Sequence, residues 1–514
     1  MKKKLFILLV IIPVLTTVFP QGCGRNRETF TGKETLSLVE LVKRGESDLF
    51  KVSSERYKTD TKELPIGVFD SGIGGLTVLA EILRLDSFNN ITHEPGQDGR
   101  PDFERERFVY IGDQANMPYG AYPSEEKTDF LRELIIKDAV FLLGDRYWPS
   151  ASHEIPRYDK PPVKAIVIAC NTATAYGLED VRTALSEWKL PVYLVGVVEA
   201  GAEGAVETLI KQKIQGAVAV MATEGTCASE GYLRALEKSS QKAGITSPTV
   251  IQQGCLGLAG AVEGDASYIV PPGKENTVEY RGPAVSNTAA PIDTALIARY
   301  SFDAGGLLGS PGSPVTWHLN SVENYIRYHT AALVDRYSRN TGAKPISAVI
   351  LGCTHFPYYV DSISASFNRL RNYRLPDGSE PYKKILAEQL VFIDPAELTT
   401  EQLYKALADK MLLLRDDETS VIAVDEFYIS VPNPSLAGVK LEQGGGFTYE
   451  YKYGRTPGNI TLEYVKRVPM NMENLSAMVR ESIRKSMPGV WEQLIAFNRE
   501  SPRTRDLPDE MRIR

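Results

Sequence analysis

Cysteine, histidine and tryptophan are scarce in this chain, with 5, 5 and 4 of them among 514 residues. The cysteines are widely scattered, so they do not form the dense disulfide framework of a small secreted domain. No CxxC pair and no cluster of histidine and cysteine has the ligand spacing of a zinc site. We therefore expect neither a disulfide scaffold nor a bound metal.

An excess of positive charge is also missing. The formal net charge is −7 and the isoelectric point is about 5.6. Because a phosphate backbone needs a concentrated basic face, this composition argues against a nucleic-acid partner. Apolar residues make up 43% of the chain and charged residues 24%, which is typical of a soluble globular protein. The length is enough for roughly three domains.

Long apolar runs are absent after the first twenty or so residues, and no later segment has the length of a transmembrane helix. The start of the chain differs: a basic stretch at 1–4 precedes an almost wholly apolar stretch at 5–18, which has the length of a signal-peptide core. Gly22 and Cys23 follow, and they resemble a bacterial lipoprotein processing site, although Pro20 stands where leucine is usual. We expect a signal peptide over 1–23 and an exported protein anchored to a membrane of the cell envelope by a lipid on Cys23. An uncleaved anchor and a fortuitous apolar start remain the alternatives.

The body of the chain predicts an α/β protein. Residues 24–63 are polar and charged, and we expect them to form a tether. From Pro65 onward, short β-branched runs end in glycine, aspartate or cysteine and are followed by helical patterns, which is the order of a mainly parallel sheet. Buried strands are predicted at 66–69, 108–111, 165–169, 192–197, 217–220 and 348–351. Helices are predicted at 76–84, at 125–143 with Ser124 as N-cap, at 205–213 and at 321–338.

Three long stretches resemble insertions, at 93–106, 145–162 and 265–313. Because such long loops are uncommon inside compact domains, each is expected to be a surface elaboration, a lid or a partly disordered segment. Residues 416–514 are expected to form a C-terminal α+β extension that packs on the core. Within it we predict strands at 420–431 and 446–453, a helix at 472–497 and a loose charged tail from 501.

One pattern occurs twice. The sequence AIVIACNT at 165–172 echoes AVILGCTH at 348–355: an apolar strand, a small residue, a cysteine and then polar residues. Ligands of open α/β sheets bind at the carboxyl ends of strands, so Cys170 and Cys353 are predicted to lie at a binding crevice. A helix starting after each cysteine would favour its thiolate. A free cysteine is more often a small buried hydrophobe, and His355 is either a proton partner or a core histidine.

A third strand end carries Asp70, followed by Gly72, Gly74 and Gly75. The glycine spacing fits neither a dinucleotide-binding loop nor a P-loop. The glycines are expected to let the backbone turn tightly beside a ligand. Asp70 would then point into the crevice; the alternative is that it caps the next helix.

Together these segments resemble the glutamate racemases, in the order that the family has them. The matching segments are DSGIGGLTV at 70–78, Gly112-Asp113, Pro118-Tyr119-Gly120, ACNTA at 169–173 and GCTHFP at 352–357. Weaker matches are Val198-Glu199, ATEGT at 222–226, and Cys255 with Glu263. The resemblance covers about 65–264 and 318–412, and leaves out the tether, the insertions and the C-terminal hundred residues.

The resemblance implies two pseudo-symmetric α/β domains with mainly parallel sheets and an active site between them. We assign 64–175 and 318–415 to a discontinuous first domain, and 176–317, with its long insertion at 265–313, to a second.

The resemblance also implies the chemistry. Cys170 and Cys353 would flank the substrate α-carbon, one removing the α-proton and the other delivering a proton from the far side, without pyridoxal phosphate, another cofactor or a metal. Asp70 would assist Cys170, and His355 would assist Cys353. Glu263 is also implied as catalytic, although Leu256 and Gly260 replace prolines that the family has nearby. The substrate would be held by Ser71, Pro118, Tyr119, Gly120, Asn171, Thr172, Thr223, Thr226 and Thr354. Cys227 and Cys255 are expected to be structural.

A symmetric pair of similar bases suits an enzyme that must work in both directions. The implied function is the interconversion of L- and D-glutamate, with D-glutamate supplied to peptidoglycan. Two alternatives stay open: racemisation of another acidic or broader amino-acid substrate such as aspartate, and a non-catalytic surface-binding protein on the same fold. A homodimer is compatible with the resemblance, and the cytoplasm, where family members normally act, is the alternative location.

Overall fold

The computed structural model describes residues 37–211, 213, 216–270, 279–310 and 312–514. The predicted signal peptide, Cys23 and the Pro-Pro-Gly sequence at 271–273 lie outside the described residues. Within the described part of the chain, no helix is long and apolar enough to cross a membrane.

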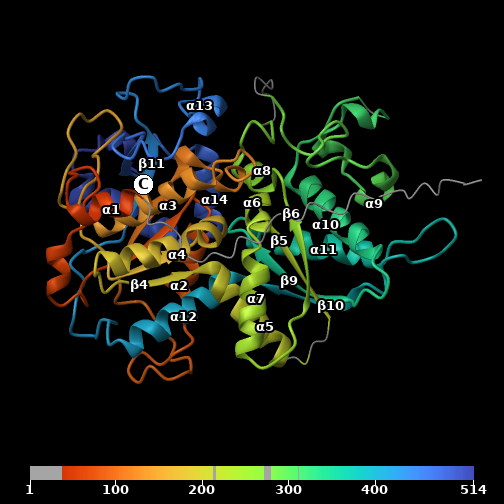
Figure 1. The fold of residues 1–514 in the computed structure, drawn as a ribbon, viewed down its shortest axis with the longest axis horizontal. Helices are drawn as coiled ribbons and strands as arrows, with labels where there is room; N and C mark the ends of the chain where they lie inside the picture. The colour runs from red at the N-terminus through yellow and green to blue at the C-terminus, as the bar shows by residue number, and fades with distance from the viewer. Residues whose placement is uncertain (1–36, 212, 214–215, 271–278, 311) are drawn as a thin grey trace, which may run out of the picture. The chain divides into compact units, whose positions relative to one another are not determined.

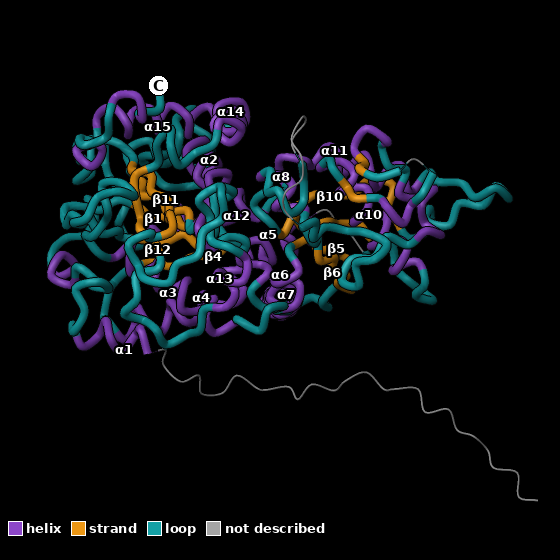
Figure 2. Tube along the Cα trace, turned by 90° about the horizontal axis from the view of Figure 1, so that it is seen from above, coloured by secondary structure: helices purple, strands orange, loops and turns teal. Residues whose placement is uncertain are grey.

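The first sheet has six strands in the order β12-β11-β2-β1-β3-β4 (Figure 1). All neighbours pair in parallel except β11 and β12, which are antiparallel. Their bounds are β1 Ile66–Asp70, β2 Phe108–Gly112, β3 Ala165–Ile168, β4 Tyr193–Gly196, β11 Glu426–Pro432 and β12 Val465–Pro469. Figure 2 shows this sheet as a middle layer with α2 (Leu76–Arg84) and α15 (Pro488–Glu500) on one face and α3 (Thr128–Leu143) and α4 (Asn171–Glu187) on the other.

The second sheet has four parallel strands in the order β10-β9-β5-β6. Their bounds are β5 Ala217–Ala222, β6 Thr249–Gly254, β9 Ile346–Gly352 and β10 Leu386–Ile393. One face packs against α10 (Val322–Ser338) and α11 (Val360–Arg371), and the other against α5 (Val197–Lys211) and α7 (Gly231–Lys242). The α/β class with two mainly parallel sheets is therefore confirmed.

The six strands predicted from apolar runs are all present, and five of the runs are buried on both faces of a sheet, whereas β4, an edge strand, is only partly buried at Tyr193 and Leu194. Two of the predicted helices, α2 and α10, have the expected extents, and Ser321 caps α10 by accepting a hydrogen bond from the Asn324 N–H at 3.2 Å. The helix α5 begins earlier than predicted, directly after β4. The helix α3 begins later, because Glu126 has a left-handed backbone (φ 57°) and Ser124 donates to the Ala121 carbonyl instead of capping.

The predicted grouping of strands into domains is wrong for β4 and β9. The strand β9, assigned to the first domain, lies between β5 and β10 in the second sheet, and β4, assigned to the second domain, is the edge of the first sheet. An apolar run that is buried on both faces fits either sheet, so its sequence does not reveal its neighbours. The crossover helix α12 (Pro395–Asp409) then leads back to the first sheet and contacts both α2 and α5.

The C-terminal residues belong to the first sheet and are not an appended unit. The strand β11 lies between β2 and β12, and Phe427, Tyr428 and Ile429 are at most 1% exposed. The end of the chain, expected to be loose, is packed: Ile513 is only 2% exposed and belongs to the same core (Figure 1).

Two further C-terminal predictions are wrong. Most of the strand predicted at 446–453 is instead the helix α13 (Tyr449–Gly454), in which Thr448 is the N-cap and Tyr449 packs on Tyr453 one turn later. The single helix predicted at 472–497 is two helices, α14 (Ala477–Ser486) and α15, because Pro488 has no N–H with which to continue α14.

The described part of the predicted tether and parts of the insertions contribute to the core. The helix α1 (Ser37–Arg44) buries Leu38, Val39 and Val42 against the first core. The ring of Phe88, just before the first insertion, stacks on Tyr404 with centroids 4.5 Å apart. The third insertion contributes Ile292 and Tyr300 to the core of the second sheet. The remaining elements are α6 Glu224–Ala228, α8 Leu258–Glu263, α9 Ile297–Tyr300, β7 Leu307–Leu308 and β8 His318–Leu319.

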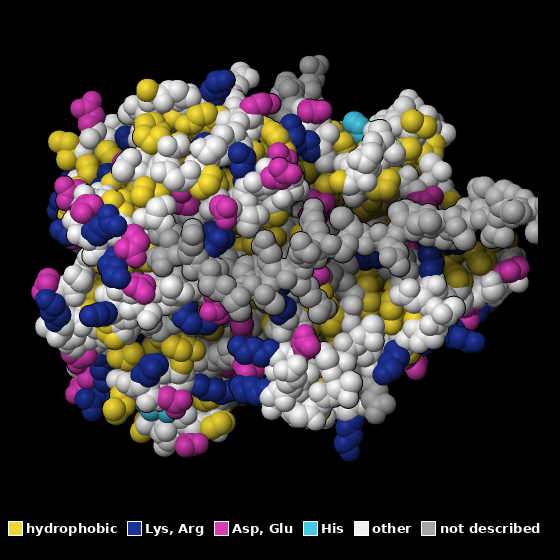
Figure 3. All heavy atoms as spheres, in the orientation of Figure 1, with side chains coloured by type: hydrophobic (Ala, Val, Ile, Leu, Met, Phe, Trp, Pro, Cys, Tyr) yellow, Lys and Arg dark blue, Asp and Glu magenta, His cyan; other side chains and the backbone are white. Residues whose placement is uncertain are grey.

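The surface is mixed in charge on the face seen in Figure 3, where acidic and basic side chains are interspersed with apolar ones.

If β11 is integral to the sheet, shortening a side chain in it must destabilise the whole molecule. We predict that Ile429→Ala lowers the free energy of unfolding, measured by urea denaturation, by about 2–5 kcal/mol, because it leaves a cavity in the core. The matched control is Ile91→Ala, since Ile91 is 78% exposed; its effect should stay within about 0.5 kcal/mol. Similar small effects of both substitutions would show that the C-terminal strands are dispensable for the core.

Candidate active site

The loop after β1 is the centre of the candidate site. Asp70, at the end of the strand, is 1% exposed, and its Oδ2 accepts hydrogen bonds from the N–H groups of Gly75 at 2.9 Å and Gly72 at 3.3 Å. Its other oxygen, Oδ1, is buried without a hydrogen-bond partner among the described residues. Burial raises the pKa of the Asp70 carboxyl, and the nearby charge of His355 opposes this only in part. The carboxyl of Asp70 is therefore held in place by its own loop.

The glycines of this loop are required by close approach. A Cβ on Gly74 would lie 2.6 Å from Thr354 Oγ1 and 2.7 Å from His355 Cε1. A Cβ on Gly72 would lie 2.7 Å from Met117 Sδ and 3.1 Å from Glu263 Oε1. The loop that follows β1 of the first sheet thus packs against Thr354, His355 and Glu263, which come after strands of the second sheet.

Cys170 follows β3 and is the N-cap of α4, as predicted. Its Sγ accepts a hydrogen bond from the Ala173 N–H at 3.4 Å and lies 3.6 Å from Ser71 Oγ. Burial raises the pKa of the Cys170 thiol far above its usual range, and the negative charge of Asp70 raises it further. These two effects outweigh the helix N-terminus, which favours the thiolate.

Cys353 follows β9 in a different setting. No helix starts directly after it, in contrast to the prediction, because a turn and a short 3-10 segment precede α11. Its Sγ lies 3.5 Å from His355 Nδ1. The polar group beside the Cys353 thiol is therefore the imidazole of His355 and not the helix N-terminus that was expected.

Glu263, at the end of α8, is brought to His355 despite the local departures from the family pattern. Glu263 Oε1 lies 2.7 Å from His355 Nε2, and Glu263 Oε2 accepts a hydrogen bond from Gln114 Nε2 at 3.1 Å. Burial by itself would lower the pKa of His355, but hydrogen bonds with Cys353 and Glu263 and the charges of both groups raise it well above its usual range. The result is a chain of contacts from Cys353 through His355 and Glu263 to Gln114. Gln114 was not predicted; its position just after the end of β2 was the available signal.

Three threonine hydroxyls form a cluster. The Oγ1 atoms of Thr172, Thr223 and Thr226 lie 2.9–3.0 Å from one another. Gly120 packs against it, since a Cβ there would lie 2.8 Å from Thr223 Oγ1. Hydroxyl groups from α4 and α6 and the backbone of the 118–120 segment thus meet at one place, which is suited to binding a carboxylate.

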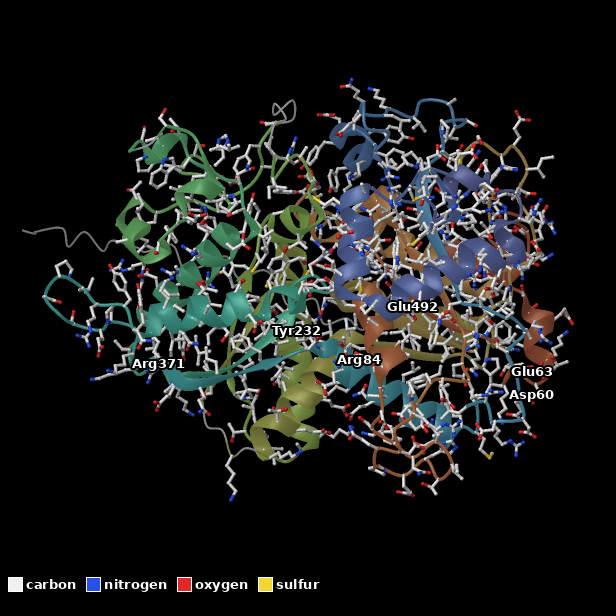
Figure 4. The ribbon with its side chains drawn as sticks, turned by 180° about the vertical axis from the view of Figure 1, so that it is seen from behind. Asp60, Glu63, Arg84, Tyr232, Arg371 and Glu492 are labelled. Atoms are coloured by element: carbon white, nitrogen blue, oxygen red, sulfur yellow. The ribbon has the colours of Figure 1, made fainter. Side chains whose placement is uncertain are left out.

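Two other predicted substrate-binding residues are engaged by the protein itself. Tyr232, on α7 (Figure 4), donates its hydroxyl to Asn171 Oδ1 at 2.6 Å, which fixes the orientation of the Asn171 amide. Tyr119 is 1% exposed, and its hydroxyl lies 2.6 Å from Asp113 Oδ2 and 2.8 Å from Asp138 Oδ2. The phenol of Tyr119 therefore holds the segment 118–120 in place.

The four cysteines of the described residues are all free. Cys255 is buried, with its Sγ 3.4 Å from the Gln253 carbonyl oxygen, and Cys227 is partly exposed on α6. Among the described residues, neither forms a hydrogen bond with His355, Glu263 or Asp70.

Comparison with known proteins gives no matching family model. A glutamate racemase of Clostridium novyi (strain NT) is 26% identical over 363 residues, which are 70% of this chain and 91% of that protein. A glutamate racemase of Shouchella clausii (strain KSM-K16) is 38% identical over 183 residues, which are 36% of this chain and 50% of that protein. The chain thus spans most of one curated relative and about half the length of others.

Solved structures give similar matches. The glutamate racemase isoform RacE1 of Bacillus anthracis is 24% identical with a TM-score of 0.40, covering 71% of this chain and 88% of that one. The glutamate racemase of Francisella tularensis, solved with D-glutamate, is 20% identical with a TM-score of 0.38, covering 72% and 88%.

The relatives named here by sequence are amino-acid racemases. The chain is distantly similar to these glutamate racemases, and it is longer than the relatives that it matches.

The contact between His355 and Glu263 makes a prediction about protonation. Glu263→Gln should lower the pKa of His355, because a neutral amide no longer favours the charged imidazolium. The chain has 5 histidines, so their ring signals can be followed by NMR during a pH titration, with His355→Asn to assign the signal. The control is Glu388→Gln, an exposed carboxylate on β10, which should leave this pKa unchanged. An unchanged or higher pKa of His355 in Glu263→Gln would contradict the contact.

Proposed function

We propose that this protein interconverts L- and D-glutamate without a cofactor, using Cys170 and Cys353 as its two proton-transfer groups. The observation that carries the proposal is that both cysteines end a strand and that each has a separate acid/base partner beside the same glycine loop. Asp70 begins that loop, and Gly74 within it packs against His355.

Each thiol has a route for its proton. On one side, Asp70 has a buried unpartnered oxygen, and its charge acts on Cys170. On the other side, His355 links Cys353 to Glu263. In one direction a thiolate removes the α-proton while the opposite thiol gives up its proton to the far face of the α-carbon, and the roles reverse for the other enantiomer. The proton count is balanced, because one thiol gains the proton that the other loses.

The negative charge that develops on the substrate carboxylate also needs stabilisation, and fixed donors aimed at that charge provide it. The hydroxyl cluster of Thr172, Thr223 and Thr226, with the backbone around Gly120, is the group of donors that we assign to this task. The cluster lies at the carboxyl ends of β3 and β5, and ligands of such sheets bind at this edge. In this role the protein would supply D-glutamate for peptidoglycan.

A second candidate function is racemisation of another acidic or broader amino-acid substrate. The surroundings of α8 favour it: a Cβ on Gly260 would lie 2.4 Å from the ring of Tyr268, a residue of the third insertion. The helix that carries Glu263 is therefore packed in a way that the family pattern, with a proline at this position, does not share. A panel of amino acids in the assay below separates the two candidates.

The test is proton exchange at the α-carbon. In D₂O the purified protein should incorporate deuterium at Cα of glutamate from either enantiomer, without added cofactor. Cys170→Ala and Cys353→Ala should each lower racemisation by at least about 10²–10⁴-fold, because a proton-transfer group is lost. Cys227→Ala is the matched control: this free cysteine on α6 lies outside the proposed proton-transfer groups, so the variant should retain activity. If no amino acid exchanges its α-proton, the enzyme function is refuted in favour of a non-catalytic binding protein. Full activity of either Cys170→Ala or Cys353→Ala would exclude the two-thiol mechanism.

We also propose that Cys23 carries a lipid that anchors the protein in the cell envelope. The support is the sequence of the first 23 residues: a basic start, an apolar stretch and a cysteine. Radiolabelled palmitate should enter the wild-type protein and not Cys23→Ala. Equal labelling of both proteins would refute the anchor at this residue.

A further inference from the structure

We propose that Lys452, Arg455 and Arg467, three cations of the C-terminal residues, position the loop 113–122 and thereby set the affinity for the substrate. They are positioning residues for the reaction proposed above, on which this inference rests.

The loop 113–122 connects both halves of the candidate site. At its start, Gln114 donates a hydrogen bond to Glu263, the partner of His355. Further along, Gly120 lies against Thr223 of the hydroxyl cluster. A shift of this loop would therefore move the donors around the substrate carboxylate and loosen the support of His355.

Arg467, on β12, holds the loop through two buried carboxylates. Its Nη2 donates to Asp138 Oδ1 at 2.7 Å, and the Tyr119 hydroxyl lies between Asp138 and Asp113. Asp113 and Asp138 are both 0% exposed. Burial and the neighbouring Asp113 raise the pKa of Asp138 to about 7, although Arg467 acts in the opposite direction. Arg467 is thus the cation that pairs with the buried Asp138 carboxylate.

Arg455 reaches one of these carboxylates, Asp113, by another route. Its Nη2 donates to Asn116 Oδ1 at 2.7 Å, and Asn116 Nδ2 lies 2.9 Å from both oxygens of Asp113. The guanidinium lies over the ring of Phe447 at 4.6 Å and over that of Phe130 at 5.0 Å. This packing fixes Arg455 in a single place, so the orientation of Asn116 is fixed as well.

Lys452, on α13, holds the middle of the loop. Its Nζ donates to the Met117 carbonyl oxygen at 2.6 Å. Met117 immediately precedes the 118–120 segment, and its sulfur lies 2.7 Å from the position that a Cβ on Gly72 would take. Lys452 thus contacts the loop at Met117 and Arg455 contacts it at Asn116. Arg467 acts on Tyr119 through Asp138.

Within the described residues, none of the three cations forms a hydrogen bond or an ion pair with a cysteine, His355 or Glu263. Their effect on the reaction must therefore pass through the loop. The loop backbone faces the groups that we assign to binding the substrate carboxylate, so its misplacement should weaken binding in the ground state and the transition state alike. Such a loss appears in KM more than in kcat.

The experiment compares Arg467→Met with Lys466→Met, using glutamate racemisation by the full chain. Lys466 is the adjacent residue of the same strand, 3% exposed, and its Nζ donates to the Ala151 and His153 carbonyl oxygens instead of the loop. We expect Arg467→Met to raise KM by about tenfold or more, with a smaller fall in kcat. Lys466→Met should lower the melting temperature but leave KM unchanged. Arg467→Lys should recover part of the affinity, because it keeps the charge but loses the planar guanidinium.

A pH profile separates positioning from loss of stability. Because Arg467 lowers the pKa of Asp138, removing it should move the inflection that Asp138 causes in KM above pH 7. Lys466→Met should not move this inflection. If Arg467→Met fails to fold, Lys452→Met, which removes one hydrogen bond from a partly exposed side chain, should raise KM severalfold.

The outcomes distinguish this inference from the proposed function. A wild-type protein that racemises no amino acid would refute the proposed function before any variant is compared. An active wild type, with KM and pH profile unchanged in both Arg467→Met and Lys452→Met, would overturn the positioning role alone. Equal KM effects of Arg467→Met and Lys466→Met would also overturn it, since they would reflect general destabilisation.

Discussion

The whole candidate site depends on one close approach, that of the loop between Asp70 and Gly75 to the residues after β9. Gly72 and Gly74 have no side chains to hold this loop away from Glu263 and His355. Even one methyl group at Gly74 would overlap Thr354 and His355, and such overlap forces a backbone shift. The two sheets can share one site only because this loop is thin.

The same constraint determines where charge is buried. With both sheet ends packed against the loop, the ionisable groups around it lose water and need partners within the protein. On the side of the second sheet the partners are close in sequence to the site: His355, Glu263 and Gln114. On the side of the first sheet the compensating charge comes from β12, far along the chain. The C-terminal strands thus complete both the sheet and its electrostatics, which explains why they are integral to the core.

The sequence predicted what is local and missed what is distant. Runs such as 165–169 and 348–351 are apolar throughout, so strands and the cysteines at their ends followed directly. The strand β12 was missed because Lys466 and Arg467 interrupt its apolar pattern, and their partners (backbone carbonyls at 151 and 153, and Asp138) are far away in sequence. The domain assignment of β9 failed for the same reason, since pairing partners leave no mark on a strand buried on both faces. Glu263 shows the reverse case: its local pattern departs from the family, yet its position at the end of α8 still brings it to His355.

The two thiols have different surroundings, and this difference has a consequence for the proposed reaction. Cys170 is a helix N-cap beside a buried carboxyl, whereas Cys353 is beside an imidazole whose pKa is raised. L- and D-glutamate have the same free energy in solution, so kcat/KM must be equal in the two directions whatever the surroundings of each thiol. The asymmetry can therefore affect only how kcat and KM divide between the enantiomers, and which protonation state of the free enzyme each enantiomer binds. One enantiomer needs a thiolate at Cys170 and the other at Cys353. Burial and the charge of Asp70 oppose the thiolate at Cys170, whereas the Sγ of Cys353 lies 3.5 Å from His355 Nδ1, so the two enantiomers meet different partners at the thiol that takes their proton.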